Sequence, residues 1–399
     1  MKFCHVSGAD LDLKIYSSIK EIGGDWDSRL PPNHSLQSKN WLVLEQSDLP
    51  LFEFWYVQIF EKGVWIGQAA FQIVEIKNKS FNFSGLEKTI RGLVCALLKT
   101  SKVQVLVCGN LLRQNQIGFY FKEARFNPKI FSVVKKLTHW RKGIASPVVS
   151  LIKDYPNNSE ELIASKAAGF KPLDEDTTMT MCLDPQWTSL EDYSKSLTKK
   201  YAQRFQKIRL AGQSVVKRPM DENDLTLYSE SIEKLYSDLV NRQNFRPFSV
   251  NSGYFLNMKK ELGKDFEVMG YFSGNDLVAF SSYHYYDSDA MEIHYIGFDV
   301  VENENKMLYF NILFDGLEKA ISKKMSSLFL GRGSFDAKSS LGAEVKENHH
   351  YIWLKPGIYV FLFQIILQYY QKSEGKIRIV RNPFRKVEKP ELLTAEPSF

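Results

Sequence analysis

The most regular pattern of apolar and polar positions lies between residues 290 and 341. Residues 290–298 are rich in aromatic and β-branched side chains, which predicts a strand. Apolar side chains then recur at helical spacing over 310–321, and residues 303–305 (Asn-Glu-Asn) can cap that helix. Residues 326–330 form a short apolar run that two glycines end, so they predict a second, buried strand.

A strand, a helix and a second strand in this order predict a βαβ unit whose two strands run parallel. Ligands bound by such sheets usually lie beyond the carboxyl ends of the strands. The stretches 297–303 and 331–338 follow these two strands along the chain. We therefore expect them to form one rim of a ligand site.

The first third of the chain carries helices and strands of its own. The pattern predicts helices at 10–22, 38–46, 86–98 and 127–140 and strands at 54–61, 64–76 and 103–108. The later region predicts helices at 193–211, 224–244 and 253–262 and a hairpin of 267–272 with 277–286. The two regions show a similar order of elements, which indicates two domains in a chain of 399 residues.

The boundary between the two domains is expected between Pro156 and Ser189. This divides the chain into an N-terminal domain over 1–156, a connecting segment over 157–188 and a second domain over 189–356. An apolar and then basic segment follows over 357–386. Residues 387–399 lack apolar periodicity and predict a flexible tail.

Composition narrows the class of protein only in part. A hydrophobic content of 44% can build sizeable cores, and a net charge of +6 suits an anionic ligand, a nucleic acid or an anionic membrane face. The four cysteines lie far apart, which argues against a disulfide framework and favours a reducing compartment. The N-terminal sequence has no apolar signal-peptide region, and no apolar run is long enough to span a bilayer. We expect a cytoplasmic protein that can touch the inner face of the membrane.

Motifs of high specificity for one chemistry are absent from the sequence. There is no GxSxG, HExxH or P-loop pattern, and no GxGxxG follows a strand. His349 and His350 are adjacent, so on a strand their side chains would point apart. We therefore predict no metal site.

Candidate catalytic groups lie on the predicted sheet of the second domain. Glu292 and His294 share one face of their strand, and His284 lies on the neighbouring strand. A carboxylate beside an imidazole can deprotonate an amine, or it can be a structural pair on a half-exposed sheet. Tyr309 and Asn311, on the following helix, point in different directions, so one of them can line the site.

The turn after the second strand offers candidate binding groups. Gly331 and Gly333 would let the backbone approach a ligand closely, and Arg332 and Lys338 would contact an anion. A plain tight turn explains the same residues equally well. Amides that open the next helix would add to an anion site.

A strongly basic tract covers residues 195–209. Lys200, Arg204 and Lys207 share one face at helical spacing. The face can be simply solvated, or it can close over a phosphate or an anionic headgroup. Nucleic-acid binding is the third interpretation, because no aromatic platform or known DNA-binding motif accompanies the tract.

Three stretches together resemble a known family. They are HYIGFD, the later LFLGRGSFDAKSSLGAE and the earlier LEDYSKSLTKKYAQRFQK. They are similar to the FemAB-like branch of the GNAT acyltransferase superfamily, and the ending RNPFRK is also similar. The resemblance covers 189–353 and is looser in the first third. It implies a mixed α/β fold with tandem GNAT-like domains (the acyl-CoA N-acyltransferase fold), of which the first is degenerate and the second more typical.

The resemblance also implies an activity, the transfer of an acyl or aminoacyl group to an amine. In the GNAT fold the strand equivalent to 291–298 splays from its neighbour and admits the donor's pantetheine arm, so Ile296, Gly297 and Phe298 are expected to line that arm. The co-substrate would be an acyl-CoA or acyl-carrier thioester, with no tightly bound cofactor. The family's glycine-rich pyrophosphate loop is replaced here by residues 300–306, which carry two glutamates and no glycine. That replacement disfavours ordinary acetyl-CoA binding.

The segment 357–386 bears on the acceptor. Its aromatic-rich apolar part and adjacent basic residues suit an interfacial anchor on an anionic leaflet, or else a core helix that caps the second domain. We predict an N-acyltransferase that acts on an amine of an envelope-related or lipid-like acceptor. The alternatives are an aminoacyl-tRNA-dependent peptidoglycan bridge transferase, the one case in which nucleic acid would be a partner, and a non-catalytic binding protein. The oligomeric state is left open.

Overall fold

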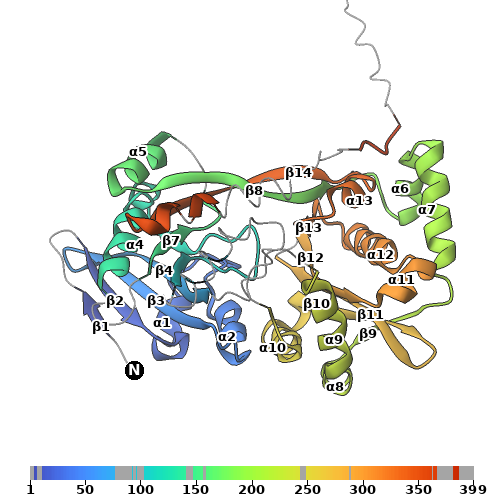
Figure 1. Cartoon of the computed structure of the whole chain (residues 1–399), viewed down its shortest axis with the longest axis horizontal. Coiled ribbons are helices and arrows are strands. Elements are labelled where there is room, and N and C mark those ends of the chain that lie inside the picture. Colours follow the sequence, from blue (N-terminus) through green and yellow to red (C-terminus); the bar gives the residue numbers. More distant parts are fainter. Residues whose placement is uncertain are drawn as a thin grey trace, which may run out of the picture.

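The computed structural model describes residues 4–6, 11–76, 92, 96, 103–140, 147–155, 159–242, 249–286, 289–361, 363–365 and 381–385. Two halves of similar construction lie side by side, and two long strands run between them (Figure 1). The described strands belong to one mixed sheet with the order β1-β2-β3-β4-β5-β7-β14-β8-β13-β12-β11-β10-β9, and β6 pairs with β4 outside this path.

The N-terminal half contains seven strands and four α-helices among its described residues. The strands are β1 (Cys4–Val6), β2 (Asp12–Tyr16), β3 (Phe52–Glu61), β4 (Val64–Ile76), β5 (Val103–Cys108), β6 (Phe119–Phe121) and β7 (Val149–Ile152). The helices are α1 (Gly24–Asp27), α2 (Ser38–Gln46), α4 (Lys129–Trp140) and α5 (Ser159–Ala168), with 3-10 turns η1 (Ile19–Glu21) and η3 (Ala124–Phe126). Strands β5 and β7 are parallel and α4 connects them.

The C-terminal half repeats this plan. Its strands are β9 (Val216–Met220), β10 (Phe266–Ser273), β11 (Asp276–Tyr285), β12 (Ala290–Phe298) and β13 (Ser327–Gly331). Its helices are α6 (Leu190–Ser196), α7 (Lys199–Ala211), α8 (Glu222–Leu227), α9 (Ser229–Val240), α10 (Ser252–Leu262), α11 (Val300–Lys306), α12 (Leu308–Ser322) and α13 (Phe335–Ser339), with the 3-10 turn η4 (Gly263–Asp265). Strands β12 and β13 are parallel, and α11 and α12 lie between them in the chain.

Two strands join the halves into one sheet. β8 (Lys171–Cys182) pairs with β13 of the C-terminal half, and β14 (Glu344–Leu354) pairs with β7 of the N-terminal half. β8 and β14 also pair with each other over most of their length. The stretch 157–188 therefore carries a helix and a long strand of the common sheet, while the expected domain boundary stays a prediction.

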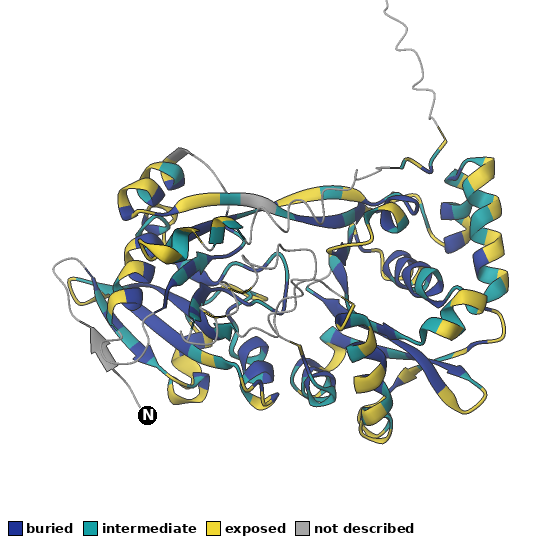
Figure 2. Cartoon of the chain, in the orientation of Figure 1, coloured by how far each residue is buried: buried dark blue, intermediate teal, exposed yellow. Residues whose placement is uncertain are grey.

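Apolar burial follows the strands and the inner faces of the helices. Figure 2 shows the strands of both halves as largely buried and the outer helices as exposed on one side. Leu313, Leu317 and Ile321 of α12 are buried against the sheet, as their helical spacing predicts.

Several predicted elements are confirmed. The strands of the hairpin β3–β4, the strand β5 and the helix α2 lie where the pattern places them. The same holds for the hairpin β10–β11 and for the unit formed by β12, α12 and β13, whose strands are parallel.

Other predicted elements are wrong. Residues 12–16 form β2 and not part of a helix, because Leu13 and Ile15 are buried at the period of a strand that pairs with β3. The helices predicted at 193–211 and 224–244 are each two helices, interrupted at 197–198 and at Tyr228. Residues 303–305 lie inside α11, which Asp299 caps, and a left-handed Met307 (φ 49°) separates α11 from α12.

Some predictions fall largely outside the described residues. They concern the helix at 86–98, the basic run within 372–386 and the tail over 387–399. Within the part of the chain that the structure describes, no helix is both long and apolar enough to cross a bilayer.

Candidate active site

The parallel strands β12 and β13 diverge at the rim predicted from the sequence. Their register pairs are Ala290 with Ser327, Met291 with Leu328 and Glu292 with Phe329. No pair follows, although β12 continues to Phe298. Beyond Glu292 the edge of β12 that faces β13 is therefore unpaired with it.

A β-bulge on each strand explains why they diverge. In β12, His294 and Tyr295 together face the single residue Ser282 of β11, and the Ser282 hydroxyl bridges the backbone N and O of Tyr295 at 2.9 Å each. In β13, the pairing with β8 shifts between Phe329 and Gly331. Because a bulge bends its strand, two bulges just past the last shared pair turn the strands apart.

Glu292 and His294 lie together, as the alternation predicts. Their side chains are buried, and His294 Nδ1 lies 3.5 Å from Glu292 Oε1. Tyr254 Oη lies 2.8 Å from His294 Nε2, and the Tyr286 hydroxyl donates to Glu292. Burial raises the pKa of Glu292, but His294, Tyr286 and Arg113 outweigh it, so this pKa lies below its ordinary value.

His284 is placed beside a cation. The Arg113 guanidinium, from the loop after β5, contacts the His284 ring at 2.6 Å from Nδ1, and it also donates to Asn40 Oδ1 at 2.8 Å. Burial and the Arg113 charge hold the pKa of His284 well below its usual range. An imidazole in this position is a poor proton acceptor near neutral pH, so His284 does not suit the role of base.

Arg332 and Lys338 do not stand free for an anionic ligand, contrary to the expectation from sequence. Arg332 makes a two-point contact with Asp176 of β8, with Nε donating at 2.6 Å. Lys338 is buried, and its Nζ donates to the carbonyls of Arg332 at 2.7 Å and Gly331 at 3.2 Å. Burial, with the charge of Arg332, lowers the pKa of Lys338 to about 7.

Lys338 thus occupies the carboxyl end of β13, and no carboxylate in the described part of the chain pairs with it. Near neutral pH a substantial fraction of this lysine is unprotonated, which makes it the better-placed proton acceptor at the point where the strands part.

The two helix residues predicted to line the site differ in their surroundings. The Tyr309 ring lies tilted against Phe298 (ring centroids 5.8 Å), and Tyr309 hydrogen-bonds with Ser334, so it lies between the ends of β12 and β13. Burial raises its pKa. Asn311 instead joins α12 to α7, because its Nδ2 donates to the Ile208 carbonyl at 2.9 Å and its Oδ1 accepts from Arg209 at 3.2 Å. Asn311 therefore braces two helices and does not line the site.

Three further predicted lining residues belong to the end of β12. Ile296 is half-buried and packs against the side chains below α12, and Phe298 packs beside Tyr309. Gly297 lies on the opposite side, where an added Cβ would come within 2.9 Å of the α9 backbone. Gly297 thus permits close packing of α9, and Ile296 and Phe298 remain beside the parted edge.

The amides that would receive a pyrophosphate are already occupied. Asp299 Oδ1 accepts from the backbone N–H groups of Val301 at 2.8 Å and Glu302 at 3.0 Å. A second carboxylate, that of Glu302, pairs with Lys306 on the same turn. The start of α11 therefore repels an anion, in agreement with the missing glycines.

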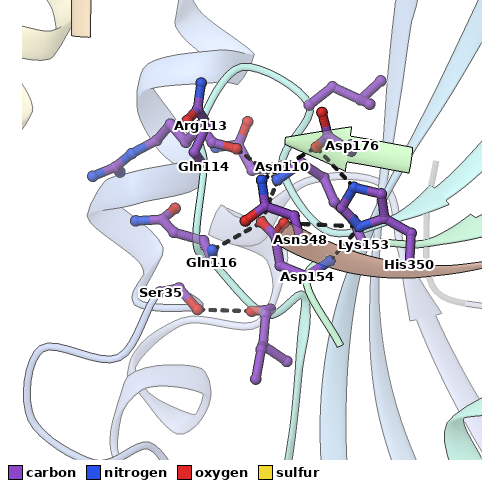
Figure 3. Close-up of polar contacts among 12 residues, drawn as sticks. Ser35, Asn110, Arg113, Gln114, Gln116, Lys153, Asp154, Asp176, Asn348 and His350 are labelled. Carbon is purple, nitrogen blue, oxygen red and sulfur yellow. Dashed lines mark hydrogen bonds and ion pairs between the residues drawn. The ribbon is translucent and has the colours of Figure 1, made fainter. Parts of the chain in front are cut away.

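A group of charged side chains, which we call the polar junction, connects this rim to the other half. It consists of Lys153, Asp154, Asp176, Asn348 and His350 (Figure 3). His350 Nε2 lies 2.9 Å from Asp176 Oδ2, and its Nδ1 accepts from the Asp154 backbone N–H at 3.0 Å. Since Nδ1 is an acceptor, the Nε2 atom carries the proton and donates it to Asp176.

The loop above the junction holds several buried polar atoms with no hydrogen-bond partner. They are Asn110 Nδ2, Arg113 Nε, Gln114 Oε1, Asn115 Nδ2 and, in the junction itself, Asp154 Oδ1. Each such atom costs about 1–3 kcal/mol, and their concentration in one place is typical of functional sites. Asn115 and Asp154 also have left-handed backbones (φ 54° and 55°), a second feature that gathers at such sites.

Sequence analysis did not identify these residues. Lys153 and Asp154 are two adjacent charges directly after a buried strand, and this was the available signal. Arg113, Tyr254 and Asp176 lie far from the rim in sequence, and only the tertiary packing brings them to it, Arg113 from the N-terminal half.

Among the solved structures, FemX is similar to this chain with a TM-score of 0.52 and 11% identity, covering 92% of this chain and 100% of that one. A tandem GNAT protein from the clavulanic acid biosynthesis pathway matches with a TM-score of 0.48 and 8% identity, covering 87% and 99%. L-PGS from Bacillus licheniformis matches with a TM-score of 0.45 and 10% identity, covering 82% and 95%. No protein-family profile and no curated protein matches the sequence. The likeness to FemX extends over both halves and shows that the chain has the fold of FemX, as the FemAB-like resemblance predicts.

Proposed function

We propose that this protein is an N-acyltransferase, which moves an acyl group from a thioester to an amine. The observation that carries the proposal is the parting of β12 and β13 after the pair of Glu292 with Phe329. An unpaired strand edge offers backbone N–H and C=O groups to an extended ligand such as a pantetheine arm. The thioester carbonyl would then lie near the carboxyl end of β13.

The reaction needs a neutral amine. The amine nitrogen attacks the thioester carbonyl, the C–S bond breaks and the thiolate leaves. The proton lost by the amine passes to Lys338, whose pKa of about 7 allows it to accept one near neutral pH. Glu292 and His294 are the second candidate for this role, but they already contact each other, Tyr254 and Tyr286.

The acceptor is proposed to be an amine on an envelope-related or lipid-like molecule, as expected from the apolar and basic segment 357–386. Of that segment, Ile358 and Phe361 are 47% and 55% exposed. Arg381 pairs with Asp336, and Arg385 Nε donates to the Leu197 carbonyl at 2.9 Å. Residues 381–385 are thus anchored beside α6 and α13.

A donor screen tests the proposal. Purified protein would be mixed with acyl thioesters of CoA, of free pantetheine and of acyl carrier protein, each with a panel of primary amines and amino-lipids. Mass spectrometry detects the amide and a thiol reagent detects the released thiol. We expect an amide from at least one pair, at a rate that rises with pH through about 7 as Lys338 loses its proton.

Variants at Lys338 sharpen this test. Lys338→Met and Lys338→Arg should lower kcat by about 10²-fold or more, because neither side chain can accept the proton. Lys346→Met is the matched control, since Lys346 is an exposed lysine near β13 that lies over the Phe329 ring. Equal activity in all three variants would remove Lys338 from the mechanism.

A non-catalytic binding protein is the second candidate. Two observations favour it. The backbone amides at the start of α11 are already bound by Asp299, and the Arg332 guanidinium is already bound by Asp176. Absence of amide formation from every thioester and amine in the screen would select this candidate.

A further inference from the structure

The outer face of α7 carries lysines that no acidic side chain neutralises. Lys199, Lys200 and Lys207 are exposed, and within the described part of the chain none of them makes an ion pair. The opposite face holds Ile208, which is buried, and Phe205, which packs against Phe314 (ring centroids 4.9 Å). α7 is therefore fixed to the fold by one face and presents the other to a partner.

The arginines of α7 contact α12, whereas its exposed lysines do not. The Arg204 guanidinium lies over the Phe310 ring at 4.8 Å, and Arg209 Nη1 pairs with Asp315 Oδ1 at 2.5 Å. Both contacts attach α7 to α12. Among the described residues of this helix the exposed positive charge thus comes from its lysines, because Arg204 and Arg209 are only partly exposed.

α7 lies beside the place where the strands part. Arg204 touches Phe310, which directly follows Tyr309, and Tyr309 lies between the ends of β12 and β13. Asn311 ties the same turn of α12 to the last turn of α7. Figure 1 shows α7, α11 and α12 as neighbours on the outer side of the C-terminal half. A donor that enters the parted edge past α11 and α12 would pass the lysine face.

We propose that the lysine face of α7 docks an acidic carrier protein, which presents the acyl group as a thioester on its pantetheine arm. This inference rests on the proposed function and names its donor. Asp299 occupies the amides at the start of α11, so they do not bind a pyrophosphate. The part of the donor that carries the pantetheine arm must therefore bind elsewhere. Exposed lysines beside the entrance supply that attachment by charge complementarity.

The surroundings of the lysines favour a protein over an RNA. Leu210, at the end of the same helix, is 65% exposed, and Val301 of the adjacent α11 is 72% exposed. An amphipathic acidic helix, which has both carboxylates and apolar side chains, matches lysines mixed with exposed apolar residues.

Charge reversal tests the docking directly. A triple variant of the full chain, Lys199→Glu, Lys200→Glu and Lys207→Glu, would be compared with wild type for binding to a purified, acylated acyl carrier protein by interferometry at low and moderate salt. We expect the Kd to rise at least tenfold and the salt dependence to flatten. The control triple is Lys20→Glu, Lys122→Glu and Lys166→Glu, which makes the same change of net charge on exposed lysines of the N-terminal half.

The possible outcomes separate docking from catalysis. Turnover of a free acyl-pantetheine thioester should be equal in wild type and in both triple variants, since it needs no docking. If wild type binds no carrier protein, if both triples weaken binding equally, or if bulk tRNA displaces the carrier from the α7 face, the docking inference is wrong. If the carrier binds at α7 but no thioester is ever consumed, the docking stands and the proposed function fails.

Discussion

The two βαβ units of this chain share one plan but end differently. In the N-terminal half, β5 and β7 pair from Val105 with Val149 to Cys108 with Ile152, so the pairing reaches the last residue of both strands. In the C-terminal half, β12 runs six residues past its last pair with β13. We call the N-terminal βαβ unit the closed unit, because its parallel strands stay paired to their ends, and the C-terminal βαβ unit the open unit. Only the open unit has an unpaired strand edge, that of β12, to offer a ligand.

A buried lysine follows the second parallel strand in each unit. The hydrogen-bond partners of this lysine differ between the two units. Lys153 pairs with the Asp154 carboxylate and donates to the Arg113 carbonyl at 2.8 Å. Lys338 donates to two carbonyls and has no carboxylate. Burial lowers the pKa of both, but only Lys153 has a carboxylate that opposes the shift. The closed unit neutralises its lysine, whereas the open unit leaves its lysine ready to exchange a proton.

Removal of Lys153 should have the largest effect on stability. Lys153→Met leaves the Asp154 carboxylate buried and unpaired, so we expect a loss of about 3–5 kcal/mol in the free energy of unfolding. Lys338→Met leaves no charge behind and should not destabilise the protein at pH 7. Urea unfolding of both variants measures the difference, and the double variant Lys153→Met, Asp154→Asn should recover most of the loss, because Asn removes the charge and tolerates the left-handed backbone. Equal losses in the two single variants would contradict the contrast between the units.

The pH dependence of stability should report Lys338 specifically. Its pKa is about 7 in the folded state, against about 10.4 in the unfolded chain. Between these values the unfolded chain binds a proton that the folded protein does not, so the free energy of unfolding rises with pH over this window and this contribution is flat below it. Relative to Lys338→Met, wild type should gain about 2–4 kcal/mol from pH 7 to pH 10. Urea unfolding at each pH gives the free energy of unfolding of the two proteins. If the two curves of this free energy against pH are parallel, the lowered pKa of Lys338 is refuted.

Two glycines at the strand ends should respond unequally to a methyl group. At Gly118 an added Cβ would collide with the Gly109 backbone and lie 2.7 Å from the Cys108 carbonyl carbon, at the end of β5. At Gly297 it would lie 2.9 Å from the α9 backbone, beside β12. Gly118→Ala should cost about 3 kcal/mol and Gly297→Ala about 1–2 kcal/mol, because the three nearest atoms at Gly118 are all backbone, whereas the nearest at Gly297 belongs to the Phe280 ring. Chemical denaturation distinguishes them, and the reverse ranking would contradict the tighter closure of the N-terminal unit.

The contact of Arg332 with Asp176 should give the smallest effect. Arg332 is 43% exposed, so Asp176→Asn should cost only about 1 kcal/mol of stability. The exposed pair of Lys195 with Glu191 provides the control, and Glu191→Gln should change stability by less than about 0.5 kcal/mol. A loss above about 3 kcal/mol for Asp176→Asn in thermal unfolding would show that the polar junction depends on this carboxylate as a whole.

The fold could be predicted from the sequence where a local pattern decides the structure. Strand β12 and helix α2 begin and end where their apolar periods place them, because side-chain alternation follows directly from backbone geometry. Residues 12–16 show the limit of this approach. Their helical spacing competes with a strand period, and the pairing of β2 with β3 decides in favour of the strand.

Only the position of the site on the fold could be predicted from the sequence. The shared face of Glu292 and His294 and the rim at Gly331 follow from strand periodicity and from the βαβ connection. The partners that change their chemistry, such as Arg113 beside His284 and Asp176 beside Arg332, come from more than 150 positions away. Asn311 looked like a lining residue because the sequence does not show that α7 ends against it.

The exchange of β8 and β14 between the halves also restricts motion. A hinge between the two halves would require the ladder of β8 with β14 to break, because those strands are the only described part of the sheet between β7 and β13. The unpaired edge of β12 should therefore keep its position relative to the N-terminal half throughout a turnover cycle. Selectivity for the acyl chain would then depend on the side chains beside this edge, and not on the closing of one half upon the other.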